Sequence, residues 1–338
     1  MQTVLVTGAS GFIASHVILA LIEQGYRVRG TARSAGKAAR INHLLSEYAG
    51  KPIQIEIVSL DLMKDEGWAE AMQGVDFLQH IASPFPATQP QSADELIIPA
   101  REGTLRALKA AKAAGVKRVV LTSSIAAMVS GWGKARPAVF DESHWTQLGQ
   151  KEAVPFYNQS KTIAEQAAWA YIRGEGQGME LAVINPAAVL GPVMSQDVST
   201  SLSLVSEIFK QSLPAFPKMD FGIVDVRDIA QAHLAAMEKP AAAGKRFIMS
   251  AGEMRFRQIG KILAEAYPEQ KIPTRELPSW LVRLVALFMP KLRPSLSRLD
   301  KKLRLSHRQA EEVLGIDFIS PKDAILASAV SLKQVGAI

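Results

Sequence analysis

The chain has 338 residues, of which 48% are hydrophobic and 21% are charged, and it contains no cysteine. These proportions are typical of a folded globular protein and exclude a disordered, collagen-like or disulfide-stapled chain, a thiolate nucleophile and a zinc–sulfur site. The formal net charge is +7, and much of the excess lies in residues 291–308, which hold seven basic residues and one acidic residue. The first residues lack a basic leader, and the apolar runs are far shorter than the roughly 20 residues of a membrane span. We therefore expect a cytoplasmic protein without integral membrane association.

Short β-branched runs alternate with longer helical patterns through most of the chain. The expected strands are Val4–Val6, Arg27–Arg29, Ile53–Val58, Val75–Leu78, Val119–Leu121, Leu181–Ile184 and Phe247–Met249. The expected helices are Phe12–Gln24, Ala38–Tyr48, Glu95–Ala114, Ser160–Arg173 and Ile229–Glu238. This alternation predicts an α/β fold, a Rossmann-type doubly wound parallel sheet of about seven strands.

The regular alternation ends after Pro186. Residues 1–186 and 221–250 are predicted to form a Rossmann domain that binds a dinucleotide. Residues 187–220 and 251–338 flank the last strand–helix pattern, so we expect them to form a smaller, mostly helical substrate-binding domain over the carboxyl edge of the sheet.

A glycine turn joins the first strand to the first helix. Gly8 permits the tight turn, Gly11 lets the backbone approach a pyrophosphate, and the small Ala14 lets helix and strand pack closely. The N–H groups at the start of such a helix point at anionic oxygens. We predict a dinucleotide cofactor that contacts the following residues: Gly8, Ser10, Gly11, Phe12 and Ile13.

The end of the second strand lacks the acidic residue that binds a ribose 2′-hydroxyl in NAD sites. Arg33 follows the strand instead, and Lys37 comes one turn later, so a guanidinium and an ammonium are available to a 2′-phosphate. This pattern favours NADP(H) as the cofactor; the alternative is that both are solvated loop charges. Asp61 and Leu62, after the third strand, are candidates for contact with the adenine.

A serine pair and a Tyr-x-x-x-Lys pattern are the candidates for catalysis. Ser123 and Ser124 end the fifth strand, and Tyr157 and Lys161 lie four residues apart in a helical pattern. That spacing puts both side chains on one helix face, where the ammonium stabilises a phenolate and equips the tyrosine to exchange a proton near neutral pH. Alone, the pattern is common by chance on exposed helices.

With the glycine turn, the serine at a strand end and Tyr-x-x-x-Lys in this order, the chain resembles the extended short-chain dehydrogenase/reductase family. It is most similar to the branch of dihydroflavonol reductases, cinnamoyl-CoA reductases and aldehyde or methylglyoxal reductases. Further segments that fit this branch are Gly30–Ser34, His80–Phe85, Leu121–Ser124, Asn185-Pro186, Gly191-Pro192, Val224–Asp228 and Ala232-His233.

The resemblance implies a role for each matching position. Tyr157 would give the proton, Lys161 would tune it and hold the nicotinamide ribose, and Ser124 would hydrogen-bond the substrate oxygen, with Ser123 the less favoured of the serine pair. The residues implied to lie beside the cofactor at the later strand ends are Ala82, Ser83, Pro186 and Val189.

Two departures from the better-known members bear on the substrate. The segment Val154–Tyr157 lacks the Lys-Asn-Trp-Tyr run of cinnamoyl-CoA reductases, and Val129 stands where plant dihydroflavonol reductases usually have an asparagine. Both substrate classes are therefore disfavoured. A mostly apolar set of candidate pocket residues suits a small apolar or aromatic aldehyde or ketone, although such residues serve equally in packing. They are Phe85, Ile125, Val129, Phe156, Val189 and Met194.

The leading hypothesis is an NADPH-dependent reductase of a small carbonyl substrate (an aldehyde, ketone or α-dicarbonyl), a monomer or homodimer with no nucleic-acid partner. One alternative is a nucleotide-sugar epimerase or dehydratase. Dehydratases have an Asp-Glu pair where this chain has Ile125-Ala126, and epimerases keep NAD bound, which predicts an acid near Arg33. Another alternative is a non-catalytic NADP(H)-sensing protein; such proteins often lose the tyrosine or the lysine, and both are present here.

Three other features receive structural interpretations. Asp228 is predicted to be the N-cap of the helix that begins at Ile229, and not one of a catalytic carboxylate pair with Asp225. The six histidines are scattered, so no metal site is predicted. The segment Trp280–Met289, followed by the basic residues, is expected to pack on the substrate domain; the alternative is a peripheral membrane helix.

Overall fold

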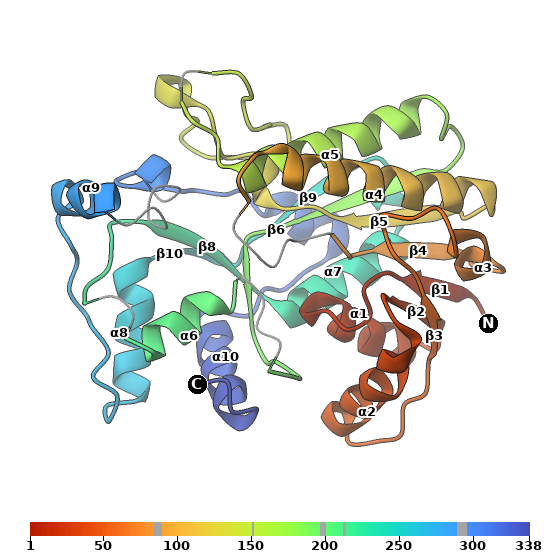
Figure 1. Ribbon diagram of the computed structural model, residues 1–338, viewed down its shortest axis with the longest axis horizontal. Helices are drawn as coiled ribbons and strands as arrows, with labels where there is room; N and C mark the ends of the chain where they lie inside the picture. The colour runs from red at the N-terminus through yellow and green to blue at the C-terminus, as the bar shows by residue number, and fades with distance from the viewer. Residues whose placement is uncertain (84–89, 151, 197–200, 212–213, 289–295) are drawn as a thin grey trace.

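A parallel sheet forms the centre of the computed structural model, which describes residues 1–83, 90–150, 152–196, 201–211, 214–288 and 296–338 (Figure 1). This seven-stranded sheet has the order β3-β2-β1-β4-β5-β6-β9, and neighbouring strands run parallel. The expected doubly wound α/β fold is thus confirmed. The strands are β1 Thr3–Val6, β2 Arg27–Ala32, β3 Glu56–Ser59, β4 Phe77–His80, β5 Arg118–Thr122, β6 Glu180–Pro186 and β9 Arg246–Met249.

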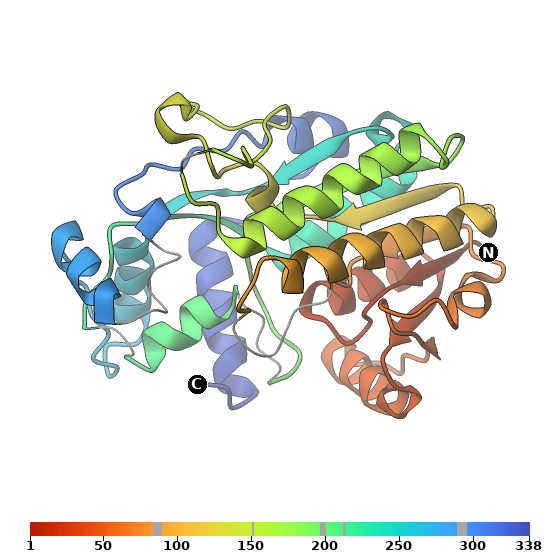
Figure 2. The same ribbon diagram turned by 45° about the horizontal axis from the view of Figure 1, so that its top comes forward.

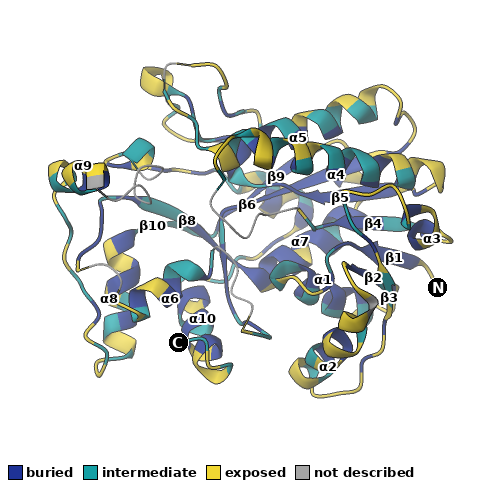
Figure 3. Ribbon diagram, viewed as in Figure 1, coloured by how far each residue is buried: buried dark blue, intermediate teal, exposed yellow. Residues whose placement is uncertain are grey.

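Helices cover both faces of this sheet (Figures 1 and 2). On one face α1 and α7 pack together with α2 nearby, and on the other face α4 and α5 pack together with α3 beside them. Because both faces are covered, the central strands are mostly apolar in their middle residues and are largely buried (Figure 3). The helices are α1 Phe12–Glu23, α2 Ala38–Ala49, α3 Trp68–Met72, α4 Asp94–Ala113, α5 Phe156–Arg173 and α7 Val226–Glu238.

The third strand begins later than its apolar residues indicate. Ile53 and Ile55 were expected in the strand, yet β3 begins at Glu56. Two side chains of α2 explain the difference. Asn42 Oδ1 accepts a hydrogen bond from Ile55 N at 3.0 Å, and Ser46 Oγ accepts one from Ile53 N at 2.8 Å. Bonded to the helix, these backbone groups do not join the sheet.

Helix α5 begins at Phe156, four residues before the expected Ser160. Pro155 has extended backbone angles and its carbonyl accepts the hydrogen bond of Gln159 N at 3.0 Å, so it is the N-cap residue. Proline suits a helix start because its nitrogen carries no hydrogen and so leaves no backbone donor without a partner there. Tyr157 consequently lies in the first turn of α5.

A smaller unit lies to the left of the large sheet in Figure 1. It contains a three-stranded sheet in the order β10-β8-β7, so it is not only helical. β8 pairs with β7 and β10, whereas the expected division grouped residues 221–250 with the Rossmann domain; α7, which follows β8, does pack on the large sheet. The elements are β7 Ala188–Leu190, α6 Ser203–Phe209, β8 Asp220–Asp225, β10 Gly252–Arg255, α8 Phe256–Ala266, α9 Ser279–Phe288 and α10 Pro321–Gln334.

The N-cap of α7 is Asp225, and the prediction of Asp228 was wrong. The helix already begins at Val226, and the Asp225 carboxylate accepts a hydrogen bond from Arg227 N at 2.9 Å. Asp228 lies in the first turn, where its carboxylate accepts a hydrogen bond from Ile319 N at 3.0 Å. Burial raises the pKa of Asp228 to about 6.

Helix α9 is apolar on two faces. Val282 and Ala286 are buried against the smaller unit, which agrees with the packing expected for the segment near residue 280. The other face carries exposed side chains, namely Trp280, Leu284 and Leu287. No helix in the described part of the chain is long and apolar enough to cross a membrane; contact of α9 with a membrane surface stays an untested alternative.

Replacing Asp228 with asparagine removes a titrating carboxyl and keeps an oxygen that accepts from Ile319 N. A carboxyl whose pKa is raised from 3.8 to about 6 binds its proton more tightly in the folded state, so its contribution to stability falls as the pH rises from about 4 to about 6. We expect Asp228→Asn to be more stable than the wild type near pH 8, by up to roughly 2 kcal/mol, and to lose that advantage near pH 4. Urea unfolding across this range measures the difference, and a difference independent of pH would contradict the assignment.

Candidate active site

The candidate functional residues gather at one edge of the large sheet. β1, β4, β5 and β6 are consecutive neighbours, so their carboxyl ends meet there. The strand order reverses between β1 and β4, and open parallel sheets bind ligands at such a reversal. The segments at these strand ends are Gly8–Gly11 and Ser123–Ser124, which follow β1 and β5, His80–Ser83, which begins with the last residue of β4, and Asn185–Pro186, which ends β6.

The glycine turn is shaped by a close approach to the end of β4. Gly8 has a φ of 71°, and a Cβ at this position would lie 2.9 Å from Ala82 Cβ. Gly11 is the N-cap residue of α1 and has no side chain with which to cap it. Ser10 is exposed between them, and Phe12 and Ile13 are half-buried. The first N–H groups of α1 are thus presented to an anion, as a pyrophosphate requires.

Thr7 and His80 hold the turn against the end of β4. Thr7 Oγ1 accepts hydrogen bonds from Ile81 N and Ala82 N, each at 3.0 Å, so its own proton is directed to His80 Nδ1 at 3.1 Å. Burial, with a smaller effect from the Lys161 ammonium, lowers the pKa of His80 to about 3. The imidazole is therefore neutral, protonated on Nε2 and close to Lys161.

The glycine turn is joined to β2, and the remaining predicted cofactor residues follow β2 and its neighbour β3. Ala9 N donates to Thr31 O at 2.8 Å, which ties the turn to β2. Arg33 follows β2 directly, and Lys37 precedes α2; both side chains are exposed. Asp61 and Leu62 follow β3 and are half-buried, and no acidic residue stands at the end of β2.

The two serines after β5 have different surroundings. Ser124 is the N-cap of the short turn Ile125–Ala127; its hydroxyl accepts from Ala126 N at 3.1 Å and donates to Pro186 O at 3.4 Å. Ser123 is buried, and its hydroxyl donates to Glu165 at 2.5 Å. Of these two serines, Ser124 has the more weakly held hydroxyl; its hydrogen bond to a substrate oxygen stays a prediction.

The Tyr-x-x-x-Lys pattern occupies the first two turns of α5. Helix α5 packs on the Ile125–Ala127 turn, and Asn158 Nδ2 in its first turn donates to Ser130 Oγ at 2.8 Å. The Tyr157 side chain is 38% exposed and Lys161 is half-buried. The helix therefore brings a phenol and an ammonium to the edge that Ser124 occupies.

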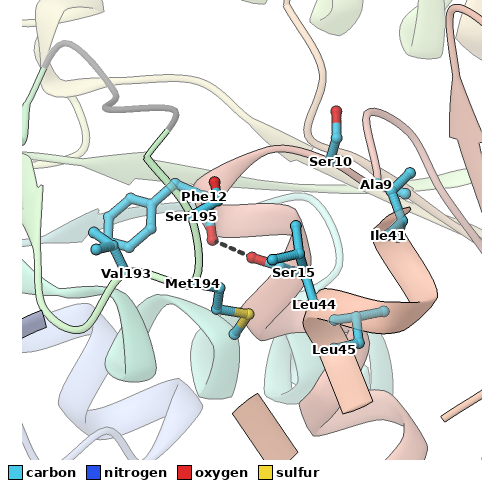
Figure 4. A pocket seen from close by; sticks show the side chains of 10 residues that line it. All are labelled: Ala9, Ser10, Phe12, Ser15, Ile41, Leu44, Leu45, Val193, Met194 and Ser195. Carbon is cyan, nitrogen blue, oxygen red and sulfur yellow. Dashed lines mark hydrogen bonds between the residues drawn. The ribbon is translucent and has the colours of Figure 1, made fainter. Parts of the chain in front are cut away.

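The predicted substrate residues are spread over several surroundings. Ile125 and Val129 pack at the edge of a small apolar cluster, and Phe156 is exposed at the start of α5. Val189 is buried in β7, and Phe85 lies outside the described residues. Met194 lines a hollow between α1, α2 and residues 193–195, with Phe12 and Ser10 nearby (Figure 4). Their contact with a substrate stays a prediction.

Three site residues were not foreseen from the sequence. Thr7 is the last residue before the glycine turn, and Glu165 lies one helical turn beyond Lys161 with Arg246 as its ion-pair partner. Glu165 could have been found from the sequence, because it is a polar residue that continues the four-residue spacing of Tyr157 and Lys161. Arg246 has no local signal, because its partner is distant in the sequence.

Comparison with known proteins identifies the class. The family model described as "NAD dependent epimerase/dehydratase family" matches residues 4–252. Cinnamoyl-CoA reductase 1 of Arabidopsis thaliana is 32% identical over 336 residues, 99% of this chain and 90% of that protein. The yeast methylglyoxal/isovaleraldehyde reductase, solved with NADPH, has a TM-score of 0.81 and 29% identity over 100% of both chains. Vestitone reductase from alfalfa (Medicago sativa) has a TM-score of 0.76 and 25% identity, also over 100% of both.

The chain belongs to the NAD-dependent epimerase/dehydratase family, the extended short-chain dehydrogenase/reductases. The resemblance inferred from its motifs is confirmed, and the relatives named above are reductases.

Substituting Gly8 with alanine should impair dinucleotide binding specifically. The new Cβ would press on Ala82 and force the turn out of shape. Gly50 is a matched control, because its φ is 64° and a Cβ there meets nothing within 4 Å. Both variants carry the strain of a left-handed backbone, about 1 kcal/mol. We expect Gly8→Ala, but not Gly50→Ala, to raise the Kd for NADPH at least about tenfold in a fluorescence titration; equal Kd values would refute this role of Gly8.

Proposed function

We propose that this chain is an NADPH-dependent carbonyl reductase that converts an aldehyde, ketone or α-dicarbonyl to an alcohol. One observation carries the proposal: helix α5, which holds Tyr157 and Lys161 in its first two turns, packs on the turn capped by Ser124. A phenol, an ammonium and a hydroxyl at the sheet edge beside the glycine turn are the groups that a hydride transfer to a carbonyl needs. Reductases among the relatives support the class.

NADPH fits the residues at this edge. The tight turn at Gly8 and the uncapped start of α1 suit a pyrophosphate, and the exposed cations of Arg33 and Lys37 suit a 2′-phosphate. The yeast structure cited above is an NADPH complex. The residues proposed to hold the cofactor are Gly8, Ser10, Gly11, Phe12, Ile13, Arg33, Lys37, Asp61, Leu62, Ala82, Ser83, Tyr157, Lys161, Pro186 and Val189.

The chain's own residues would manage the charge and the proton. Bound NADPH supplies the hydride. Tyr157 donates its phenolic proton to the carbonyl oxygen, and the Lys161 ammonium stabilises the phenolate that remains. Ser124 donates a hydrogen bond to the same oxygen; its present bond to Pro186 O is long, at 3.4 Å, so the hydroxyl can turn to a substrate at little cost.

A small apolar carbonyl compound is the proposed substrate. Ile125, Val129 and Phe156 near the catalytic set are apolar, which supports a compact hydrophobic ligand. The yeast relative is named for methylglyoxal and isovaleraldehyde. Relatives named for cinnamoyl-CoA also match, but the segment Val154–Tyr157 departs from their Lys-Asn-Trp-Tyr run, and we propose an aldehyde or ketone ahead of a CoA thioester.

Tyr157→Phe tests the proton donor. Losing general acid catalysis should lower kcat by about 10²- to 10⁴-fold, whereas NADPH binding should change little because the ring is kept. NADPH consumption is followed at saturating aldehyde, methylglyoxal or diketone, beside the wild type. Turnover that survives in Tyr157→Phe would mean that another group donates the proton.

Arg33→Ala tests the choice of NADPH. A charge-assisted hydrogen bond to a phosphate contributes about 1.5–3 kcal/mol, so kcat/KM for NADPH should fall about 10- to 100-fold while that for NADH stays unchanged. Arg27→Ala is the control, since Arg27 is an exposed arginine at the opposite end of the same strand. A uniform loss with both cofactors would show that Arg33 does not read the 2′-phosphate.

A further inference from the structure

A fully buried carboxylate lies behind the candidate catalytic residues. The Glu165 side chain has 0% exposure and accepts four hydrogen bonds. Ser123 Oγ and Asn185 Nδ2 donate to its Oε2 at 2.5 and 2.8 Å, and Arg246 Nε and Trp169 Nε1 donate to its Oε1 at 2.5 and 3.3 Å. All four partners are donors, which is the surrounding that suits an ionised carboxylate.

These bonds join one helix to three neighbouring strands. Glu165 belongs to α5, Ser123 follows β5, Asn185 lies in β6, and Arg246 begins β9; β5, β6 and β9 are consecutive in the sheet. Arg246 is itself fixed, because its guanidinium lies 3.7 Å from the centre of the Trp145 ring and donates to two backbone carbonyls. The carboxylate therefore sets the position of α5 on the sheet.

Both halves of the candidate catalytic set connect to this carboxylate. Tyr157, Lys161 and Glu165 recur every four residues and share one face of α5. On the strand side, Asn185 Nδ2 donates to Ser124 O at 3.3 Å as well as to Glu165. Its two acceptors fix the orientation of the amide. A shift of Glu165 would move the helix residues relative to Ser124.

The hydrogen bonds around Glu165 fix the geometry of these residues but add little to the stability of the fold. A buried ion pair adds little net stability compared with apolar side chains of similar size. The orientation that serves Glu165 also leaves Asn185 Oδ1 and Arg246 Nη2 buried with no hydrogen-bond partner among the described residues. Unsatisfied buried polar atoms are costly and usually have a functional reason.

We propose that Glu165 is a positioning residue for the carbonyl reduction proposed above, on which this inference rests. Its carboxylate ties α5 to the carboxyl ends of β5 and β6. It thereby fixes Tyr157 and Lys161 relative to Ser124.

Glu165→Gln and Glu180→Gln form a matched pair of variants. Glu180 begins β6 and accepts a hydrogen bond at 2.7 Å from Nε of Arg118, which begins β5. Glu180→Gln therefore also breaks an arginine–glutamate pair of the large sheet, but at the edge opposite the catalytic one. We expect Glu165→Gln to lower kcat by about 10- to 100-fold, as small misplacements of reacting groups do, with the Kd for NADPH little changed. We expect Glu180→Gln to keep the wild-type kcat.

The kinetic isotope effect separates positioning from loss of folded protein. With NADPH deuterated at the transferred position, poor alignment slows the hydride step, so the isotope effect on kcat should rise in Glu165→Gln. A smaller folded fraction would lower kcat without changing that effect. Glu165→Asp, which keeps the charge on a shorter side chain, should recover part of the rate.

Ser123→Ala provides a second route if Glu165→Gln leaves Arg246 unpaired and the protein does not fold. It removes one hydrogen bond to the carboxylate without exposing a charge, and we expect kcat to fall about three- to tenfold with a raised isotope effect. If the wild type fails to oxidise NADPH with every carbonyl compound tested, the proposed function is overturned. If the wild type is active, and Glu165→Gln and Ser123→Ala both keep its kcat and its isotope effect, only the positioning role is overturned.

Discussion

Parallel pairing of β1 with β4, of β4 with β5 and of β5 with β6 is the constraint on which the candidate active site depends. Each strand ends at a segment with candidate catalytic or cofactor-binding residues, and the pairing brings these segments to one edge although they are separated by up to about 180 residues of chain. The sheet does not by itself set their spacing to a few tenths of an ångström. Side chains do so locally: Thr7 joins the glycine turn to the end of β4, and Glu165 joins α5 to the ends of β5 and β6.

The features that follow from local pattern were predictable from the sequence. Glycines at a strand–helix junction indicate a tight turn, and their place at the start of an alternating α/β pattern predicts phosphate binding there; Gly8 and Gly11 stand at that turn in the structure. The large sheet was likewise predictable, because its central strands are buried on both faces and contain short runs of apolar, often β-branched residues. The Ser, Tyr and Lys candidates acquired meaning from their order along this fold.

Other features depend on distant partners and carry no local signal. Ile53 and Ile55 are apolar enough for a strand, yet hydrogen bonds from α2 keep them out of the sheet. β7 and β8 are short strands whose pairing forms a second sheet that composition does not reveal. The cap of α7 was misassigned for a related reason: Asp225 and Asp228 are equally suited to capping, and only the end of β8 decides between them.

Several cations of the basic stretch have partners within the chain, most of them distant in the sequence. Lys301 pairs with Glu152, and Arg308 pairs with Glu312. Arg298 donates to a backbone carbonyl of β8 and lies over the Phe221 ring. Part of the positive charge is thus paired within the chain. This pairing weakens the case for a polyanionic partner, which the net charge alone would suggest.

The C-terminal helix has a consequence for how the protein is made. Ser328 and Ser331 of α10 hold the backbone N–H groups of Gly191 and Val193, at 2.7 and 2.9 Å, across 137 and 138 residues of chain. At a synthesis rate of roughly 10 residues per second, these partners leave the ribosome more than about ten seconds apart. The segment after β7 must therefore wait, without its final contacts, while the seven-stranded sheet is completed. We therefore expect the large sheet to form before α10 makes its contacts with the segment after β7.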